Sequence, residues 1–316
     1  MNTSHASKID LLIDRAALFK AARTFFSDRN ILEVDCPALS QAAPIDLHID
    51  IMEVSVASNQ IGYLHSSPEY GMKRLLADGS GDIYQMSHVF RKGEIGPLHN
   101  PEFTMVEWYR LHFSFEQMIE ETLSFIRLFL GDLPASRLSY RETFKRYLNI
   151  DSAQATPSEL LALAHSLDLP PSAASWDKDT LLQLLMSFLI EPRLGENELF
   201  VLTDFPASQA ALSKTIQKGT ESVACRFEVY FRGIELANGY HELTDPQEQR
   251  LRLEASNNAR QSAGKADLKI DEHFLNALEK GLPDCCGVAV GFDRLMLLRQ
   301  KKAHLNDVLA FTWENA

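Results

Sequence analysis

Apolar residues recur at helical spacing at the start of the chain and at strand spacing soon afterwards. A period of about 3.6 residues predicts an amphipathic helix over 11–29. The next apolar positions predict strands and one further short helix. The strands are expected over 31–36, 48–56 and 62–65, and the helix over 69–77.

The central part of the chain predicts a long hairpin followed by a helix. Residues 83–91 and 103–113 are expected to form its two strands, joined by a loop that contains two glycines and a proline. Ser114 is a good N-cap for a helix over 115–130, and Gln117 three residues later completes a capping box. These strands are joined as a hairpin and not through a helix, which favours antiparallel pairing.

The region from about 133 to 196 has a different character, with short helical segments and the pair Pro170-Pro171. It predicts a helical insertion in a single domain that spans 1–316. Further strands and helices are expected after it, with a tight turn at Arg232-Gly233. The strands are 199–205, 223–231, 234–243 and 286–292, and the helices are 245–262, 271–280 and 293–299. The fold class predicted is α+β, a mostly antiparallel sheet flanked by helices.

Composition and charge narrow the function classes. The chain has 316 residues with 45% hydrophobic residues, which is ordinary for a globular protein and excludes disorder as its main description. The net charge of −12 disfavours non-specific binding of nucleic acid. No apolar run is long enough to span a membrane and no secretory signal is present, so we expect a cytoplasmic protein. The cysteines are expected to be reduced packing residues, at positions Cys36, Cys225, Cys285 and Cys286.

Candidate chemistry first appears in the hairpin 84–109. Arg91 ends one strand, where its guanidinium could bind a phosphate through two hydrogen bonds, and Phe103 could stack on a flat base. Glu107 and Tyr109 share a face with Phe103 and could bind a small cation. The alternative is that Arg91 pairs with Glu94 and that Phe103 belongs to the core.

Two carboxylates mark the strand that follows the Arg232-Gly233 turn. Glu235 and Glu242 are seven residues apart, so strict alternation would place them on opposite faces. A bulge at Asn238-Gly239 would bring both to one side, where they could hold Mg²⁺ against a nucleotide phosphate. Without a bulge they would be edge charges.

Two further segments complete the candidate site. In 287–298 a glycine-rich strand runs into a helix, where Gly291 permits close approach and Arg294 in the first turn suits an anionic ligand. The alternative is a buried strand with Asp293 as helix cap. The segment from Ser66 to Glu69 reads as a helix start, with Glu69 in the first turn.

Taken together, these segments resemble the signature motifs of class II aminoacyl-tRNA synthetases. Residues 20–40 resemble motif 1, with Pro37 as its proline, 84–109 resemble motif 2, and 287–298 resemble motif 3. Four sequence segments are similar to those of the lysyl-tRNA synthetase branch: HNPEFTMVEWY, SPE before MKRLL, ELANGYHEL and GVAVGFDRL.

One departure from that branch points to a narrower family. Lysyl-tRNA synthetases carry an N-terminal OB-fold domain that reads the anticodon, whereas here the catalytic core begins near residue 10. The chain therefore resembles the truncated paralogues that act as elongation factor P–(R)-β-lysine ligases. This resemblance implies ATP-dependent activation of (R)-β-lysine, transfer to a lysine side chain of elongation factor P, and no recognition of an anticodon or charging of tRNA.

Three smaller departures concern the site itself. Ser67 stands where lysyl-tRNA synthetases usually have alanine, and Ala289 where they usually have glycine, which fits a repositioned substrate amine as in a β-amino acid. Motif 2 usually reads Arg-Asn-Glu, but here Arg91 is followed by Lys92-Gly93. That change affects the expected nucleotide contacts of 92–94.

The resemblance also implies a role for each site residue. Arg91 and Arg294 would hold phosphates, Phe103 would stack on adenine, and motif 1 would build a homodimer. Residues expected to bind ATP are Arg91, Lys92, Gly93, Glu94, Asn100, Glu102, Phe103, Glu235, Leu236, Gly291 and Arg294. Residues expected to bind the amino acid are Ser67, Pro68, Glu69, Glu107, Tyr109, Asn238, Glu242 and Ala289. Glu235 and Glu242 would carry Mg²⁺, and Arg91, Arg294 and Glu235 would be catalytic.

Two other functions stay open at this point. One is an enzyme that charges tRNA or a tRNA-like RNA with lysine, against which the negative charge counts. The other is a non-catalytic synthetase-like regulator, against which the presence of Arg91, Glu235 and Arg294 counts.

Overall fold

The computed structural model describes residues 7–167 and 176–316. Pro170-Pro171, part of the predicted insertion, lies outside the described residues. The chain divides into two compact units, which are described separately. The first is formed by residues up to 131 together with 243–316, and the second by 132–242.

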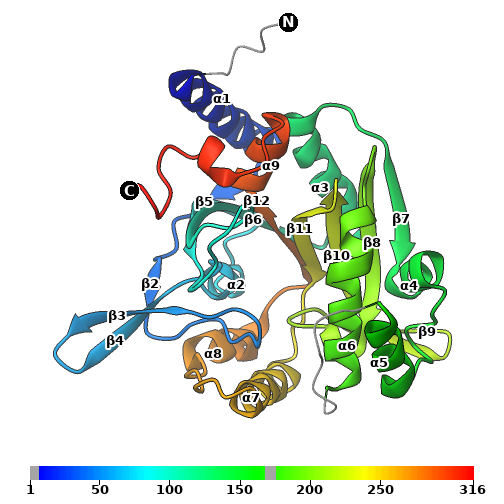
Figure 1. Ribbon diagram of the computed structural model, residues 1–316. Helices are drawn as coiled ribbons and strands as arrows, with labels where there is room; N and C mark the ends of the chain where they lie inside the picture. The colour runs from blue at the N-terminus through cyan, green and yellow to red at the C-terminus, as the bar shows by residue number, and fades with distance from the viewer. Residues whose placement is uncertain (1–6, 168–175) are drawn as a thin grey trace, which may run out of the picture. The chain divides into compact units, whose positions relative to one another are not determined.

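The first unit contains part of a large, mostly antiparallel sheet (Figure 1). Its strands follow the order β1-β5-β6-β12, in which β1 pairs with β5 in parallel and the other pairs are antiparallel. A smaller sheet has the order β2-β4-β3. The strands are β1 (Leu32–Glu33), β2 (Leu39–Ser40), β3 (Met52–Ala57), β4 (Gln60–Leu64), β5 (Ile83–Phe90), β6 (Glu102–Leu111) and β12 (Cys285–Gly291).

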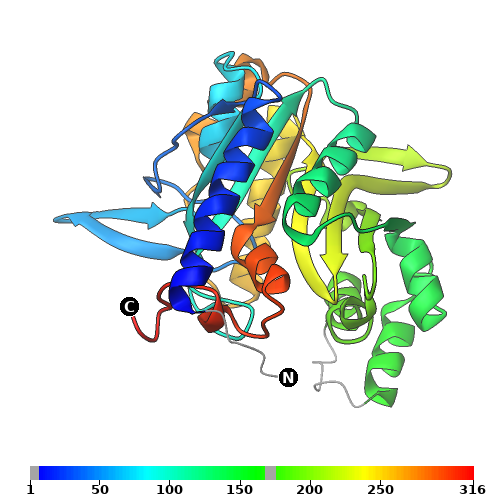
Figure 2. The ribbon, with the colours of Figure 1, turned by 90° about the horizontal axis from the view of Figure 1, so that it is seen from above.

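Helices lie on both sides of the strands of this unit. One side holds α1 (Lys8–Ser27), α3 (Phe115–Leu130) and α9 (Phe292–Arg299), and Figure 2 looks onto the face that α1 crosses. The other side holds α2 (Glu69–Ala77), α7 (Pro246–Ser262) and α8 (Glu272–Gly281) (Figure 1).

An aromatic core joins β6 to the helices of the α1 side. The Phe26 ring lies 5.4 Å from both Trp108 and Phe125. Trp108 is fully buried, so the even-numbered residues of β6 face α1 and α3. The odd-numbered residues, including Glu107, consequently face the α2 side.

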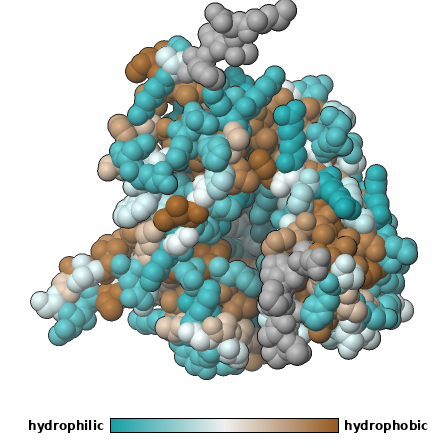
Figure 3. All heavy atoms as spheres, in the orientation of Figure 1, coloured by the Kyte–Doolittle hydropathy of each residue, from teal (hydrophilic) through white to brown (hydrophobic). Residues whose placement is uncertain are grey.

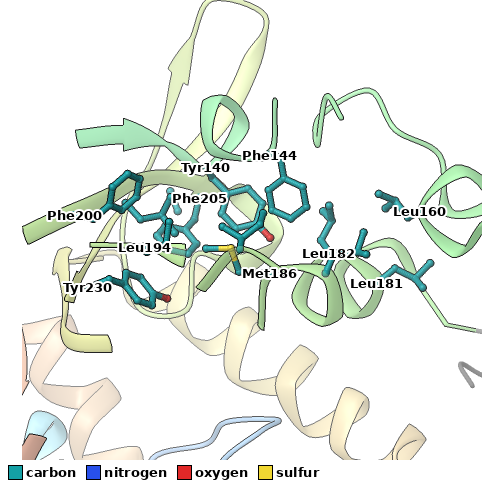
Figure 4. Packing of buried hydrophobic residues seen from close by; sticks show 14 of the residues in the cluster. Tyr140, Phe144, Leu160, Leu181, Leu182, Met186, Leu194, Phe200, Phe205 and Tyr230 are labelled. Carbon is teal, nitrogen blue, oxygen red and sulfur yellow. The ribbon is translucent and has the colours of Figure 1, made fainter. Parts of the chain in front are cut away.

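The second unit has its own strands and an apolar core. The order β11-β10-β8-β7 is antiparallel except for the parallel pair β7–β8, and β9 pairs with β10. Figure 4 shows the core between this sheet and its helices, where Tyr140 stacks on Phe144 at 4.8 Å. The elements are β7 (Ala135–Ser139), α4 (Tyr140–Leu148), α5 (Pro157–Ser166), α6 (Lys178–Leu185), β8 (Leu199–Pro206), β9 (Thr215–Lys218), β10 (Glu221–Phe231) and β11 (Ile234–His241), with short helical turns at Met186–Ile190, Glu191–Arg193 and Ala207–Gln209.

Most predicted elements are confirmed, and the differences are local. The fold class is as predicted, α2 has the predicted bounds, and both members of the Ser114/Gln117 capping box are formed. The predicted strand 31–36 is shorter than expected, because only Leu32 and Glu33 form ladder pairs with β5 and Val34 adds one backbone hydrogen bond to Tyr84. The predicted helical insertion also contains β7, which adds to the sheet edge. The single-domain assignment stays a prediction.

The hairpin β3–β4 projects from the first unit and carries exposed apolar residues. In Figure 3 its lower-left end shows hydrophobic as well as hydrophilic surface. Val56 is 54% and Ile61 58% exposed.

The four cysteines are free and buried, as predicted. In the part of the chain that the structure describes, no helix is both long and apolar enough to cross a membrane.

Candidate active site

A buried group of polar side chains lies where α2 begins, beside β6 in the first unit. Ser67 Oγ donates to Glu107 Oε2 at 2.7 Å and accepts from the Glu69 backbone N–H at 3.0 Å. Tyr109 donates its hydroxyl proton to Glu107 Oε1 at 2.7 Å. Each oxygen of Glu107 therefore accepts a hydrogen bond, and the carboxylate is held in one orientation.

Glu69 has a cationic partner on its own helix. Lys73 lies one turn further along α2, and its Nζ is 2.6 Å from Glu69 Oε1. The Lys73 side chain is fully buried, whereas that of Glu69 is 13% exposed. Glu69, Glu107 and Lys73 thus form a mixed cluster with two acidic groups and one basic group.

The pKa of Glu107 is raised to about 7 in this cluster. Burial is the largest cause, and the charge of Glu69 acts in the same direction. The hydrogen bonds from Tyr109 and Ser67 and the charge of Lys73 oppose the rise. Because burial disfavours an isolated carboxylate, a cationic ligand would stabilise the charged form of Glu107.

Ala289 faces the same group from the neighbouring strand. It is the cross-strand partner of Glu107 in the β12–β6 pair, so both side chains lie on one face of the sheet. Pro68 is the N-cap residue of α2 and makes no side-chain cap hydrogen bond. The structure therefore brings together the predicted substrate residues of the first unit: Ser67, Pro68, Glu69, Glu107, Tyr109 and Ala289.

The predicted phosphate-binding arginine lies at the loop end of the β5–β6 hairpin, directly after β5. Arg91 is 3.6 Å from Glu94, and its guanidinium stacks on the Phe103 ring at 5.1 Å. The alternative prediction was half right, since the ion pair forms but Phe103 is only partly buried and does not join the core. The buried Nε of Arg91 has no hydrogen-bond partner among the described residues, which leaves a donor for a ligand.

Arg294, the second predicted phosphate ligand, reaches the same loop. Its Nη2 lies 2.9 Å from His99 Nε2. Burial, and then the charge of Arg294, lower the pKa of His99. Gly291 has an ordinary φ of −77°, and a Cβ there would lie 3.6 Å from Arg294 Cδ. Neither the backbone conformation nor the contact with Arg294 therefore requires glycine at this position.

Other residues of the motif 2 segment bind protein groups. Asn100 donates to the Glu102 carbonyl at 2.6 Å and accepts from the Trp313 N–H at 3.0 Å. The Glu102 carboxylate pairs with His88 at 2.5 Å, and the Lys92 N–H donates to the Asp50 carbonyl at 2.8 Å. These bonds fix the loop to its surroundings.

The alternative prediction that Asp293 caps α9 was wrong. Gly291 is the N-cap residue, and no side chain caps the helix. The Asp293 carboxylate instead accepts from Arg15 Nη1 at 2.6 Å and from the Thr104 N–H at 2.7 Å. Because Arg15, which is distant in the sequence, binds the Asp293 carboxylate, this carboxylate does not cap α9.

In the second unit a β-bulge aligns the predicted metal ligands. The bulge was predicted at Asn238-Gly239, but the register shifts at Leu236, because Ala237 pairs with Val229 and Glu235 with Tyr230. The correction moves the bulge by two residues and keeps its effect. Glu235 and Asn238 fall on one face, and alternation continues to Glu242, one residue beyond β11. The buried Oδ1 of Asn238 has no partner among the residues described.

A third carboxylate, Glu228, lies on that face and was missed by the sequence analysis. Glu228 pairs across the strands with Asn238, and Tyr230 donates to its Oε2 at 2.5 Å. Arg226 Nη2 also hydrogen-bonds Glu228. Burial raises the pKa of Tyr230, and the charges of Glu228 and Glu235 add to the rise. Both carboxylates are thus close to one hydroxyl.

These carboxylates suit Mg²⁺, which proteins commonly hold through one or two carboxylates together with substrate phosphates. Over residues 7–167 and 176–316 no group of three or more His, Cys, Asp or Glu side chains forms a metal cluster on its own. Binding of Mg²⁺ by Glu235 and Glu242 therefore stays a prediction.

Lys73 and His99 were also missed, for different reasons. Lys73 could have been found from its i, i+4 spacing to Glu69 on a predicted helix. His99 gave no signal, because its contact with Arg294 joins segments that are 195 residues apart.

The mostly antiparallel sheet with its three motif segments defines a class II synthetase-type catalytic core. The chain belongs to the family tRNA synthetases class II (D, K and N), whose profile matches residues 1–315. It is 46% identical over 311 residues to the elongation factor P–(R)-β-lysine ligase of Edwardsiella ictaluri, covering 96% of this chain and 95% of that protein. It is 45% identical over 317 residues to the protein of the same name from Salmonella typhimurium, with 98% and 97% covered, and 44% identical to that of Salmonella arizonae, with the same coverage.

Proposed function

We propose that this protein activates (R)-β-lysine with ATP and transfers it to a lysine side chain of elongation factor P. The observation that carries the proposal is the group formed by Ser67, Glu69 and Glu107, in which hydrogen bonds hold a buried carboxylate in one orientation beside a second carboxylate, a pair that would suit an ammonium group. The name of the similar proteins, which cover nearly the whole chain, supports this substrate and acceptor.

The nucleotide is proposed to bind at the loop end of the β5–β6 hairpin. Phe103 would stack on adenine, and Arg91 would hold the α-phosphate with its unused Nε donor. Arg294 would neutralise the terminal phosphate. The Lys92 side chain and the Gly93 N–H would contact the nucleotide, because the side-chain carboxylate usual in this motif is absent and Glu94 already pairs with Arg91.

Mg²⁺ would be held by Glu235 together with Glu242 or Glu228, and when bound would neutralise phosphate charge. Leu236, at the bulge, would fix the direction of Glu235. Asn238 would use its unpartnered Oδ1 toward the ligand. The residues of this chain would thus supply acceptor oxygens for the cation and for the substrate ammonium group.

The activation step needs orientation and charge neutralisation more than a base. The substrate carboxylate is already ionised at neutral pH, so it can attack the α-phosphorus directly. The new carbon–oxygen–phosphorus linkage forms as the bond to pyrophosphate breaks. Arg91 and Arg294 would stabilise the charge that develops on the phosphates. In the transfer step a neutral acceptor amine attacks the adenylate carbonyl and AMP leaves.

Charging of a tRNA is the alternative function. The net charge of −12 disfavours it, since contact with a phosphate backbone needs basic side chains. We propose that the acceptor is a protein and that the enzyme works in the cytoplasm, where translation factors are found.

We propose that the enzyme is a homodimer built through α1. The helix bears exposed apolar residues, with Ile9 and Ile13 both 63% exposed. Leu32 of β1 is 55% exposed. The same helix presents a shallow, open surface formed by Ala16, Phe19, Lys20, Arg23, Thr24 and Ser27. Sedimentation of Ile13→Glu should give monomers if α1 forms the interface, and an unchanged dimer would contradict this assignment.

ATP–pyrophosphate exchange measured with a panel of amino acids tests the activation chemistry. We expect exchange with (R)-β-lysine and less with α-lysine, and none with neutral amino acids of similar length. Exchange that is equally fast with neutral amino acids would contradict the proposed ammonium site. No exchange with any amino acid would overturn the proposed activity.

A further inference from the structure

A buried hydrogen-bond network joins the first helix to the two segments that carry the nucleotide residues. Arg15 of α1 donates through Nη1 to Asp293 Oδ1 at 2.6 Å and through Nη2 to Thr104 Oγ1 at 2.7 Å. The Thr104 N–H donates to Asp293 Oδ2 at 2.7 Å. The side chains of Arg15 and Asp293 are only 14% and 3% exposed. Three separate elements, α1, β6 and α9, therefore meet in one closed set of bonds.

Aromatic rings keep the Arg15 guanidinium in place. It lies 5.1 Å from the Phe19 ring and 4.9 Å from the Phe292 ring. These two rings stack on each other at 4.3 Å. A planar guanidinium that is packed on rings and bonded at two nitrogens has little freedom, so its position is determined by the core.

The network lies directly behind the proposed nucleotide site. Thr104 follows Phe103 on β6, and Asp293 precedes Arg294 in the first turn of α9. Side chains alternate along a strand, so Thr104 faces α1 while Phe103 faces the opposite side of the sheet. Restraining Thr104 and Asp293 thus restrains the backbone from which Phe103 and Arg294 project.

We infer that Arg15 is a positioning residue for ATP, which sets the spacing between Phe103 and Arg294 by holding Thr104 and Asp293 together. The inference rests on the proposed function, because it assumes that those two side chains bind the base and the phosphates. It predicts that loss of Arg15 weakens the binding of ATP and has little effect on the binding of the amino acid, since Ser67 and Glu69 lie outside the network.

The test is steady-state ATP–pyrophosphate exchange with Arg15→Met, measured against each substrate separately. A displacement of phosphate ligands should raise the KM for ATP on the order of tenfold or more, while the KM for (R)-β-lysine changes by less than about twofold. Arg15→Lys keeps the charge but not the two-point bond, so it should recover only part of the effect. Thr104→Val, which removes the hydroxyl and keeps the side-chain shape, should also raise the KM for ATP.

Arg299→Met is the matched control. Arg299 of α9 pairs with Asp14 of α1 at 2.9 Å, so it joins the same two helices at a more exposed position away from Phe103. If Arg15 acts only by docking α1 on α9, the control will show the same change in KM. If Arg15 instead positions the nucleotide residues, Arg299→Met should leave the KM for ATP within about twofold of the wild-type value.

Urea unfolding of each variant separates loss of folding from loss of positioning, and Arg15→Lys and Thr104→Val remain informative if Arg15→Met does not fold. An unchanged KM for ATP in folded Arg15 and Thr104 variants would overturn the inference. So would equal increases for ATP and the amino acid, or the same increase in Arg299→Met. Wild-type protein without exchange activity would instead overturn the proposed function.

Discussion

The Ser67 hydroxyl donates a 2.7 Å hydrogen bond to Glu107, and Ala289 lies opposite the same residue on the neighbouring strand. Two small side chains therefore limit where Glu107 can point and how much space lies beside it. In the proposed site this geometry determines how far a substrate amine lies from the reacting carboxylate.

Ser67→Ala combined with Ala289→Gly should improve the use of α-lysine. The double change removes one hydrogen bond to Glu107 and one methyl group beside it, so the carboxylate can meet an amine one carbon nearer to the carboxyl group. We expect the ratio of kcat/KM for α-lysine to that for (R)-β-lysine to rise about tenfold. Pyrophosphate exchange with each isomer measures it.

Ser55→Ala, at an exposed position on β3, is the control for the serine substitution. It should leave the ratio unchanged. If the double variant also keeps the wild-type ratio, these two positions do not set the preference between the isomers.

Glu107→Gln should change the pH dependence of stability. The pKa of Glu107 is raised to about 7 in the folded protein, so the folded state binds more protons than the unfolded state between the ordinary carboxyl value and pH 7. The contribution of this residue to the free energy of unfolding is therefore full at low pH and is lost as the pH rises through 7. Glutamine does not titrate, so Glu107→Gln does not lose stability from this residue as the pH rises.

Urea unfolding of wild type and Glu107→Gln at pH 5 and pH 8 measures the difference. The variant should gain stability relative to wild type on going from pH 5 to pH 8. A difference that is equal at both pH values would mean that the folded state does not raise this pKa.

Lys73→Met should destabilise the protein by about 3–5 kcal/mol, because it leaves the Glu69 carboxylate without its buried counter-charge. The double variant Lys73→Met/Glu69→Gln should recover part of that loss. Arg74→Met, the next residue on α2 and exposed, is the control and should stay within about 0.5 kcal/mol of wild type. Equal effects at positions 73 and 74 in urea unfolding would refute the role assigned to the buried ion pair.

Arg294→Ala should abolish ATP–pyrophosphate exchange, a loss on the order of 10²–10³-fold or more, because the terminal phosphate loses its cation. Lys280→Ala is the control, since Lys280 is a 66% exposed cation on α8. It should retain normal exchange. Near-normal exchange in Arg294→Ala would remove Arg294 from the active site.

Local patterns were enough to predict most elements of the fold. The helix α2 and the capped helix α3 depend on spacing and on capping within a few residues, which the sequence displays directly. Strand 31–36 was overestimated because pairing depends on the neighbouring strand, and its backbone hydrogen bonds to β5 end at Val34. β7 was missed because its parallel partner β8 lies more than 60 residues further along the chain.

The candidate site was predictable as a set of residues and less so as a set of bonds. The spacing of Glu235 and Glu242 places them on one face only if the strand contains a bulge. The bulge forms at Leu236, where the register of pairing with β10 shifts, and not at the predicted Asn238-Gly239. Asp293 was expected to cap a helix by its position, but Arg15, 278 residues away, binds it instead. Contacts of this kind depend on tertiary packing and leave no local signal.

The most direct test of the proposed function is the intact mass of elongation factor P after incubation with this protein and Mg²⁺-ATP. Parallel reactions would contain (R)-β-lysine, α-lysine or no amino acid. We predict a gain of one lysyl unit on the factor, more complete with the β-isomer and absent when its acceptor lysine is replaced by arginine. An unchanged mass with both isomers, in a preparation that catalyses pyrophosphate exchange, would contradict elongation factor P as the acceptor.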